Sequence, residues 1–200
     1  MKSAPAELRR IVVAVDPAGG SSRRSDETGI IVAGVAENRE CYVLKDLSGR
    51  YSPDAWARIA VEAYHSYQAD RIVAEGNFGG AMVEATIKSV DRRVPVKLVT
   101  ASRGKQVRAE PIAALFEQRR VHLVGSFREL EDQLCTWCPL TSTHSPDRLD
   151  AMVWAITELQ PGEDMRCFTT DPWTGKFIGG SYELFRERCP TGVSSIRLGR

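Results

Sequence analysis

The chain has 200 residues, and 42% of them are apolar, which is enough to bury one sizeable core but too few for two typical domains. The 27 Lys and Arg residues nearly balance the 26 Asp and Glu residues, so the net charge of +1 excludes a chain that is basic throughout, and any surface for nucleic acid must be local. No stretch approaches the roughly 20 apolar residues of a membrane span, so we expect a soluble, cytoplasmic protein that contacts no membrane.

The first part of the chain predicts three strands and a helix. Residues 10–16 form an apolar run that ends in Asp16, as expected of a strand buried on both faces. Further strands are predicted over residues 29–36 and 41–47, and the short connections favour an antiparallel meander. Apolar residues then recur on one helical face over residues 53–67.

The second part of the chain alternates helices with short strands. Residues 71–75 form another apolar strand, which ends in Glu75, followed by a predicted helix over 79–90 and a strand over 96–99. Three later helices are predicted from turn and capping signals, which are Pro111, the pair Ser126 and Glu129, and Pro146. Residues 121–124 are interpreted as a short apolar connection.

Together these elements predict an α/β fold. Its mixed five-stranded sheet would consist of a three-strand antiparallel meander plus two parallel strands, flanked by helices. Residues 1–160 contain all of the predicted elements. Beyond them Gly, Pro and scattered aromatic residues replace periodicity, so residues 161–200 are predicted to be a C-terminal tail or appendage.

The five cysteines form an odd set without the spacing of a disulfide framework. This pattern favours reduced thiols. Cys135 and Cys138 have a spacing that zinc ligands use, but no second Cys or His pair accompanies them. We therefore expect these two residues to lie on a helix surface.

Four acidic residues stand at the ends of predicted elements. Asp16 and Glu75 end apolar strands, while Asp147 and Asp150 open the last helix on one face, three residues apart. If the two strands are parallel neighbours, their acids meet at one edge of the sheet. Clustered carboxylates repel each other, and divalent cations remove that cost. A single such acid is more simply explained as a helix cap or a charge at a strand end, so the coincidence of four carries the argument.

Five blocks between residues 10 and 159 resemble the nuclease domain of phage terminase large subunits, which belongs to the ribonuclease H-like superfamily. In order they are VAVDPAG with Asp16, DETGI with Asp26, IVAEGNFGG with Glu75, RGKQVRAEP with Lys105, and SPDRLDA with Asp147 and Asp150. The resemblance rests on their order and spacing, since each block alone is short.

The resemblance implies an endonuclease that cuts concatemeric double-stranded DNA during viral genome packaging in the host cell cytoplasm. Asp16 and Glu75 would be ligands of Mg²⁺ or Mn²⁺ in a two-metal site that hydrolyses a phosphodiester. Asp147 is the preferred third catalytic acid and metal ligand, with Asp150 close behind it. Asp26 would add an outer contact to metal-bound water.

The resemblance also implies a DNA-binding arc and a set of partners. Arg103, Lys105 and Arg108 would contact the phosphate backbone, with Lys105 facing the site or the DNA strand. No phosphate-binding loop with the pattern Gly-x-x-x-x-Gly-Lys-Ser/Thr occurs in the chain, so an ATPase domain would have to be a partner. A terminase small subunit and a portal protein complete the implied partners.

Three other functions are compatible with parts of the pattern. Another ribonuclease H-like nuclease, such as a Holliday-junction resolvase, shares the acids but prefers branched DNA. A sugar-kinase or actin-like ATPase could use residues 16–22 as a phosphate-binding hairpin, although no second Gly-rich loop follows a strand. A non-catalytic module could dock to DNA or to a portal ring through Arg103, Lys105 and the tail.

Overall fold

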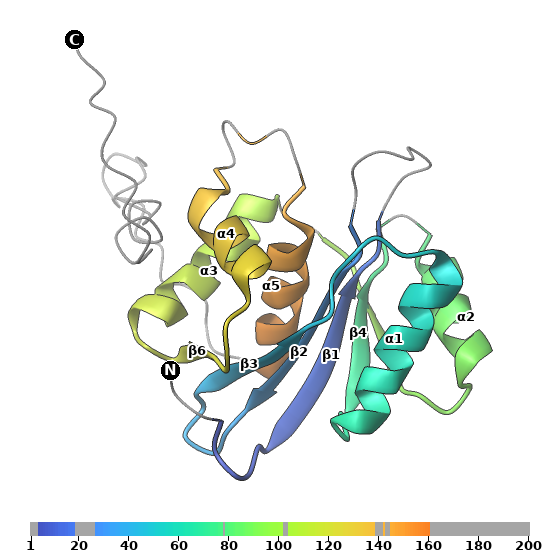
Figure 1. The fold of residues 1–200 in the computed structure, drawn as a ribbon, viewed down its shortest axis with the longest axis horizontal. Coiled ribbons are helices and arrows are strands. Elements are labelled where there is room, and N and C mark those ends of the chain that lie inside the picture. Colours follow the sequence, from blue (N-terminus) through green and yellow to red (C-terminus); the bar gives the residue numbers. More distant parts are fainter. Residues whose placement is uncertain are drawn as a thin grey trace, which may run out of the picture.

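A mixed β-sheet forms the centre of the chain. The structure is a computed structural model that describes residues 4–18, 27–77, 79–101, 104–138, 142 and 145–160. The strands in these ranges are β1 (Arg10–Asp16), β2 (Gly29–Val35), β3 (Cys41–Asp46), β4 (Arg71–Glu75), β5 (Val96–Val99) and β6 (Val121–Leu123). Their order in the sheet is β5-β4-β1-β2-β3-β6 (Figure 1).

The pairing confirms the predicted α/β class and the predicted arrangement of the first five strands. β1, β2 and β3 form the antiparallel meander, while β4 and β5 are parallel to β1. The sheet has one strand more than we predicted, because β6 pairs parallel with β3 where we expected only a connection. Three residues are too few to show a strand period, so only this pairing distinguishes β6 from a loop.

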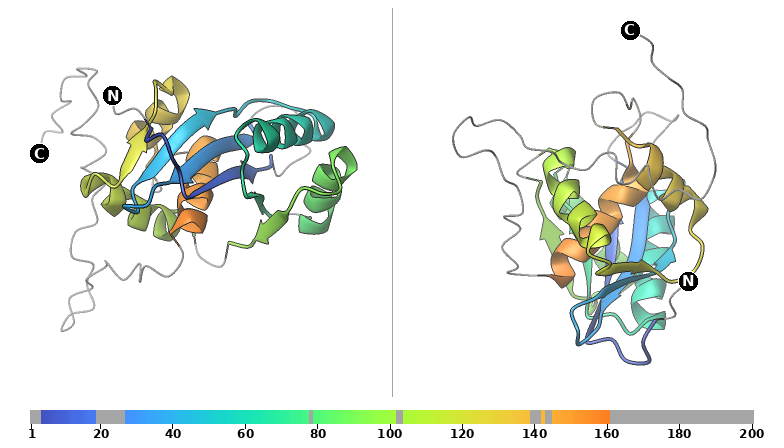
Figure 2. Two further views of the ribbon diagram at one scale, coloured as in Figure 1. Left: turned by 90° about the horizontal axis from the view of Figure 1, so that it is seen from below. Right: turned by 90° about the vertical axis from the view of Figure 1, so that its left-hand side faces the viewer.

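Helices cover both faces of the sheet and enclose two hydrophobic cores. The described helices are α1 (Pro53–Ser66), α2 (Gly80–Val90), α3 (Lys105–Glu117), α4 (Arg128–Thr136) and α5 (Asp147–Leu159). α1 and α2 lie on one face, and α3, α4 and α5 lie on the other (Figure 1 and Figure 2). Within β1, Val13 and Val15 belong to the first core, whereas Val12 and Ala14 belong to the second. All four are 0% exposed, as a strand buried on both faces requires.

The start of α3 differs from the prediction. We expected Pro111 near the first turn, but the helix begins at Lys105 and contains Pro111 in its interior. An internal proline lacks the N–H that would bond to the carbonyl four residues earlier. The helix continues through it because Ile112 and Leu115 are buried in the core below α5. As a result, Lys105 and Arg108 lie on the first turn of a helix, one above the other.

The predicted capping box of α4 is also displaced. The helix begins at Arg128, and the side chain of Glu131 accepts the backbone N–H of Phe127 at 2.7 Å. Glu131 therefore makes the capping contact that we had assigned to Ser126 and Glu129. The pattern of polar residues before an apolar stripe allows either register, and packing of Leu130 and Leu134 into the core selects the observed one.

Two further predictions concern the cysteines and the tail. Cys135 is disulfide-bonded, so the expectation of reduced thiols is wrong for this residue. The predicted tail, residues 161–200, lies outside the described residues. In the described part of the chain, no helix has both the length and the apolar composition needed to cross a bilayer.

Gly29 lets α5 approach the sheet closely. It is the first residue of β2 and pairs with Asp16, the last residue of β1. A Cβ at this position would overlap the backbone carbonyl of Asp147 and would lie 2.9 Å from the Cβ of Ala151. The missing side chain at Gly29 thus allows the first turn of α5 to rest on the sheet beside Asp16.

We predict that Gly29→Ala destabilises the fold by about 1–3 kcal/mol, the range expected for overpacking a close contact. The matched control is Gly104→Ala, because a Cβ at Gly104 meets no atom within 4 Å. The control should change stability by less than about 1 kcal/mol in either direction. Urea unfolding of the two variants measures the difference, and equal stabilities would contradict the close approach.

Candidate functional site

The four acids predicted from the sequence meet at one end of the sheet. β1 and β4 are parallel neighbours with Val15 opposite Ala74, so Asp16 and Glu75 follow side by side at the carboxyl ends of their strands. α5 packs across β1 and β2 and brings its first turn, with Asp147 and Asp150, to the same end. Residues from three distant parts of the sequence are thereby brought together.

The other three acids affect the ionisation of Asp16. Its side chain is buried, and this burial is the largest cause that raises its pKa well above the ordinary value. The charges of Asp150, Glu75 and Asp147 raise the pKa further, in that order, while Lys105 lowers it. Ionised Asp16 is therefore destabilised both by lost hydration and by repulsion.

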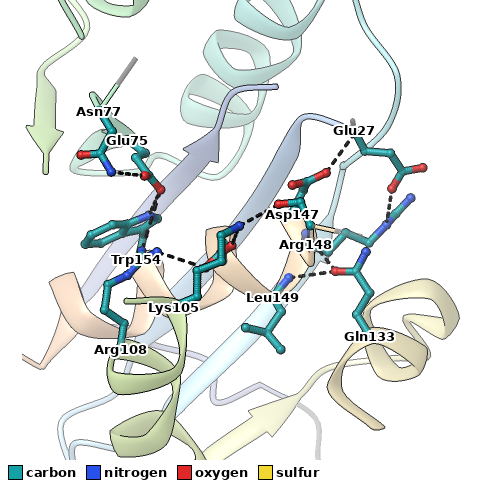
Figure 3. Close-up of polar contacts among 12 residues, drawn as sticks. Glu27, Glu75, Asn77, Lys105, Arg108, Gln133, Asp147, Arg148, Leu149 and Trp154 are labelled. Carbon is teal, nitrogen blue, oxygen red and sulfur yellow. Dashed lines mark hydrogen bonds and ion pairs between the residues drawn. The ribbon is translucent and has the colours of Figure 1, made fainter. Parts of the chain in front are cut away.

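Glu75 is held by three side chains from different elements. Asn77 Nδ2 donates a hydrogen bond to Glu75 Oε1 at 2.7 Å, and Trp154 Nε1 donates one to Oε2 at 2.8 Å (Figure 3). Arg108 Nη1 lies 3.8 Å from the same Oε2. The carboxylate thus keeps a defined orientation at the end of β4.

Asp150 is paired with two cations from α3. Its side chain is 1% exposed, and burial raises its pKa, although Lys105 and Arg108 act in the opposite direction. Lys105 Nζ donates to Asp150 Oδ2 and also to Ser145 Oγ, the latter at 2.7 Å. Arg108 Nη2 lies 3.4 Å from Asp150 Oδ1. The first turn of α3 therefore supplies both counter-charges.

Asp147 is anchored on the other side of the first turn of α5. Its Oδ2 accepts the backbone N–H of Glu27 at 3.0 Å. The next residue, Arg148, forms ion pairs with Glu27 at 3.0 Å and with Asp46 at 2.8 Å. These contacts fix the start of α5 to the start of β2 and the end of β3.

A side chain from α4 caps the N-terminus of α5. The N-cap residue is Pro146, which makes no side-chain capping bond. Instead, Gln133 Oε1 accepts the backbone N–H groups of Arg148 and Leu149 at 3.1 and 3.2 Å (Figure 3). A helix N-terminus needs such acceptors for its exposed donors. Gln133 therefore stabilises the turn that carries both aspartates.

Sequence reasoning missed the residues that support the acids, which are Asn77, Gln133, Arg148 and Trp154. Asn77 is only two residues after Glu75, so proximity in the sequence was an available signal. Gln133 and Trp154 reach the site through helix packing, and no local pattern identifies such contacts.

A cleft of about 410 Å³ opens beside the acids. Its charged lining consists of Asp16, Glu75, Lys105 and Asp147. Its apolar lining includes Pro53 and Trp56 from α1 and Met82 and Val83 from α2. Met82 is 67% exposed, so part of this apolar wall is open to solvent.

The predicted basic arc is placed only in part. Lys105 lines the cleft, and its side chain is 40% exposed. Arg108 is 11% exposed, and its guanidinium is directed at Glu75 and Asp150. Arg103 and Asp26 lie outside the described residues. Contact of any of the three basic residues with DNA stays a prediction.

The donor chemistry of the acids suits a divalent cation. Carboxylate oxygens are the ligands that Mg²⁺ and Mn²⁺ prefer, and the mutual repulsion at Asp16 is a cost that a cation relieves. In the described ranges, no three His, Cys, Asp or Glu side chains already stand in metal-ligand positions. Asp150 instead faces the ammonium group of Lys105, so cation binding at this aspartate would require the Lys105 contact to rearrange.

Comparison with known proteins relates this arrangement to one family and one fold. The family model described as the terminase RNaseH-like domain matches residues 13–159. The chain resembles the large terminase nuclease of thermophilic phage G20c, with a TM-score of 0.55, 9% sequence identity, and coverage of 76% of this chain and 83% of that one. A search of curated proteins found no match.

Two further solved structures are similar. The nuclease domain of the large terminase subunit gp2 of bacterial virus Sf6 has a TM-score of 0.54 and 13% identity, with coverage of 74% of this chain and 88% of that one. The yeast mitochondrial Holliday junction resolvase Ydc2 has a TM-score of 0.47 and 11% identity, with coverage of 78% and 80%. At 13% identity, the similarity to the Sf6 nuclease domain concerns the fold.

We predict that Asp16→Asn stabilises the metal-free protein at pH 8. Because the folded state raises the pKa of Asp16, the stabilising effect of its neutral form is present at low pH and is lost as the pH rises through the raised pKa. An asparagine cannot ionise and avoids this loss. In EDTA the variant should unfold at a higher temperature than wild type at pH 8, by roughly 2–4 °C per kcal/mol gained.

The difference in unfolding temperature should shrink toward pH 4, where Asp16 is neutral in the wild type as well. A difference that is the same at both pH values would show that Asp16 is not under electrostatic strain.

Proposed function

Because the chain belongs to the family of terminase RNase H-like domains, we propose that it is a divalent-metal-dependent DNA endonuclease. One observation carries the proposal: Asp16, Glu75, Asp147 and Asp150 gather at one end of the sheet, and Lys105 lines the cleft beside them. A site with this many carboxylates suits divalent cations. Cations bound there could in turn contact a phosphodiester.

We propose that the four acids hold Mg²⁺ or Mn²⁺. Structures of the Sf6 nuclease domain with manganese and with calcium, and of the G20c nuclease with zinc, support divalent metal binding by this fold. Two bound cations would supply activation of the attacking water and stabilisation of the departing oxygen. The contribution of the chain is to hold its carboxylates in place against their mutual repulsion.

Lys105 has a double role in this proposal. Without metal, its ammonium group neutralises Asp150, which is otherwise buried beside Asp16 and Glu75. Its partial exposure and its place in the cleft lining allow the same group to turn toward a phosphate of the DNA strand. Arg108 is more enclosed and remains an internal counter-ion of Glu75 and Asp150.

Two observations support a preference for Asp150 over Asp147, the reverse of the expectation from the sequence. Asp150 is the charge that raises the pKa of Asp16 most, whereas Asp147 has the smallest such effect of the acids. Asp147 lines the cleft but already accepts the backbone N–H of Glu27. We therefore propose Asp150 as the stronger partner of Asp16 and Glu75, with Asp147 contributing from the edge of the cleft.

The family also supports a role in viral genome packaging. We propose that the domain cuts concatemeric double-stranded DNA in the host cell cytoplasm, together with an ATPase domain, a terminase small subunit and a portal protein. The apolar part of the cleft, with Met82 exposed, would receive the sugar of a nucleotide whose phosphate lies at the acids.

We predict that Asp16→Asn and Glu75→Gln each lower nicking of supercoiled plasmid in Mn²⁺ by at least about 100-fold, because losing a metal ligand costs no less than losing a group that supports one. Glu62→Gln is the matched control, since Glu62 is an exposed acid on α1. It should cut at the wild-type rate. Undiminished cutting by purified Asp16→Asn or Glu75→Gln would refute the catalytic assignment.

A competition assay separates a packaging nuclease from a junction resolvase. Unlabelled linear duplex and a four-way junction of equal length are each added to the nicking reaction. The proposed function expects the two to compete equally, and a strong preference for the junction would instead favour a resolvase.

We predict that Asp150→Asn weakens Mn²⁺ binding more than Asp147→Asn does, because the charge of Asp150 raises the pKa of Asp16 more than that of Asp147 does. Isothermal titration calorimetry of both variants gives the two dissociation constants directly. A larger loss for Asp147→Asn would restore Asp147 as the main ligand on α5.

A further inference from the structure

The indole of Trp154 contacts both the guanidinium of Arg108 and the carboxylate of Glu75 (Figure 3). Its Nε1 donates to Glu75 Oε2 at 2.8 Å, and the guanidinium carbon of Arg108 is 4.5 Å from the ring centroid. The Trp154 side chain is 7% exposed. A residue that the sequence analysis did not identify therefore contacts one of the proposed metal ligands directly.

Trp154 lies on the same helix as Asp150 and forms a hydrogen bond with Glu75 on the sheet. It follows Asp150 by four residues in α5, so both side chains project from the same face. Asp150 belongs to α5, whereas Glu75 ends β4, and their relative position depends on how the helix packs on the sheet. The hydrogen bond from Trp154 to Glu75 therefore connects α5 to the end of β4, next to the proposed metal ligands.

The guanidinium of Arg108 lies over the face of the Trp154 ring. Its Nε and Nη1 are buried without a hydrogen-bond partner, which is costly for a charged group unless other contacts compensate. Those contacts are the face of Trp154 and the ion pairs with Glu75 and Asp150. A cation over an indole ring is a favourable contact when it is shielded from water. The stacking therefore restrains the plane of the ring and with it the direction of its N–H.

We propose that Trp154, restrained by Arg108, is a positioning residue that fixes the orientation of the Glu75 carboxylate for cation binding. The inference rests on the proposed function, in which Glu75 is a ligand. An unrestrained glutamate has three rotatable side-chain bonds, and ordering them on binding costs free energy. Hydrogen bonds from neighbouring residues to a ligating carboxylate reduce that cost, and losing one lowers metal affinity by about 10- to 100-fold.

The test compares Mn²⁺ binding by calorimetry in three proteins: wild type, Trp154→Phe and the control Trp137→Phe. Trp137 packs against the core that α5 completes and does not line the cleft. The dissociation constant for Mn²⁺ should rise by about 10- to 100-fold in Trp154→Phe. It should stay at the wild-type value in the control.

A second variant separates the hydrogen bond from the shape of the ring. Benzothienylalanine at position 154 replaces the indole N–H with sulfur while keeping the size of the ring and its stacking surface. It should show the same loss of Mn²⁺ affinity as Trp154→Phe. Wild-type affinity in this variant would show that packing alone matters, and the proposal would be overturned.

A nuclear magnetic resonance titration gives a readout that activity does not. The indole N–H signal of Trp154 is assigned by its loss in Trp154→Phe, and Mg²⁺ is added to the wild type. The signal should shift on Mg²⁺ binding and also in Glu75→Gln, and an unchanged signal in both would overturn the proposal.

The outcomes distinguish this proposal from the proposed function. If wild type cuts DNA and binds Mn²⁺ but Trp154→Phe matches the Trp137→Phe control, the positioning role fails and the nuclease assignment stands. If wild type neither binds Mn²⁺ nor cuts DNA, both fail together.

Discussion

The contact between the first turn of α5 and Gly29 is the constraint on which the site depends. Asp16 and Glu75 reach the same edge through strand pairing alone, but Asp147 and Asp150 join them only because α5 rests directly on the start of β2. The capping by Gln133 and the ion pairs of Arg148 secure this turn from two other elements. Local packing thereby places the N-terminus of α5 at the carboxyl ends of β1 and β4 with the accuracy that a site needs.

The site combines an electrostatic cost with the means of limiting it. Burial and neighbouring charges raise the pKa values of Asp16 and Asp150. The ionised forms of these two acids are therefore less stable in the folded protein than in water. Lys105 and Arg108 offset part of this cost from the first turn of α3. Proteins accept such strain where function requires it, and the core on both faces of β1 provides the stability to do so.

The surroundings of the acids divide into two parts with different consequences. On one side, Lys105 is partly exposed and lines the cleft, so the acids are open to solvent there. On the other, Arg108 and Trp154 contact Glu75 and restrict its orientation. In the proposed function, the rigid wall would hold the cations in a fixed geometry while DNA enters from the cleft.

The sequence by itself determined the strands that carry Asp16 and Glu75, because apolar runs that end in an acid are local patterns and their period is visible in a single chain. It also determined that Asp147 and Asp150 share a helix face, since their spacing is a property of the helix alone. Only the tertiary structure decided that α3 begins at Lys105, that residues 121–123 form a strand, and that Trp154 contacts Glu75. These features arise from contacts between segments distant in sequence, and the energies of such contacts leave no periodic trace in the order of residues.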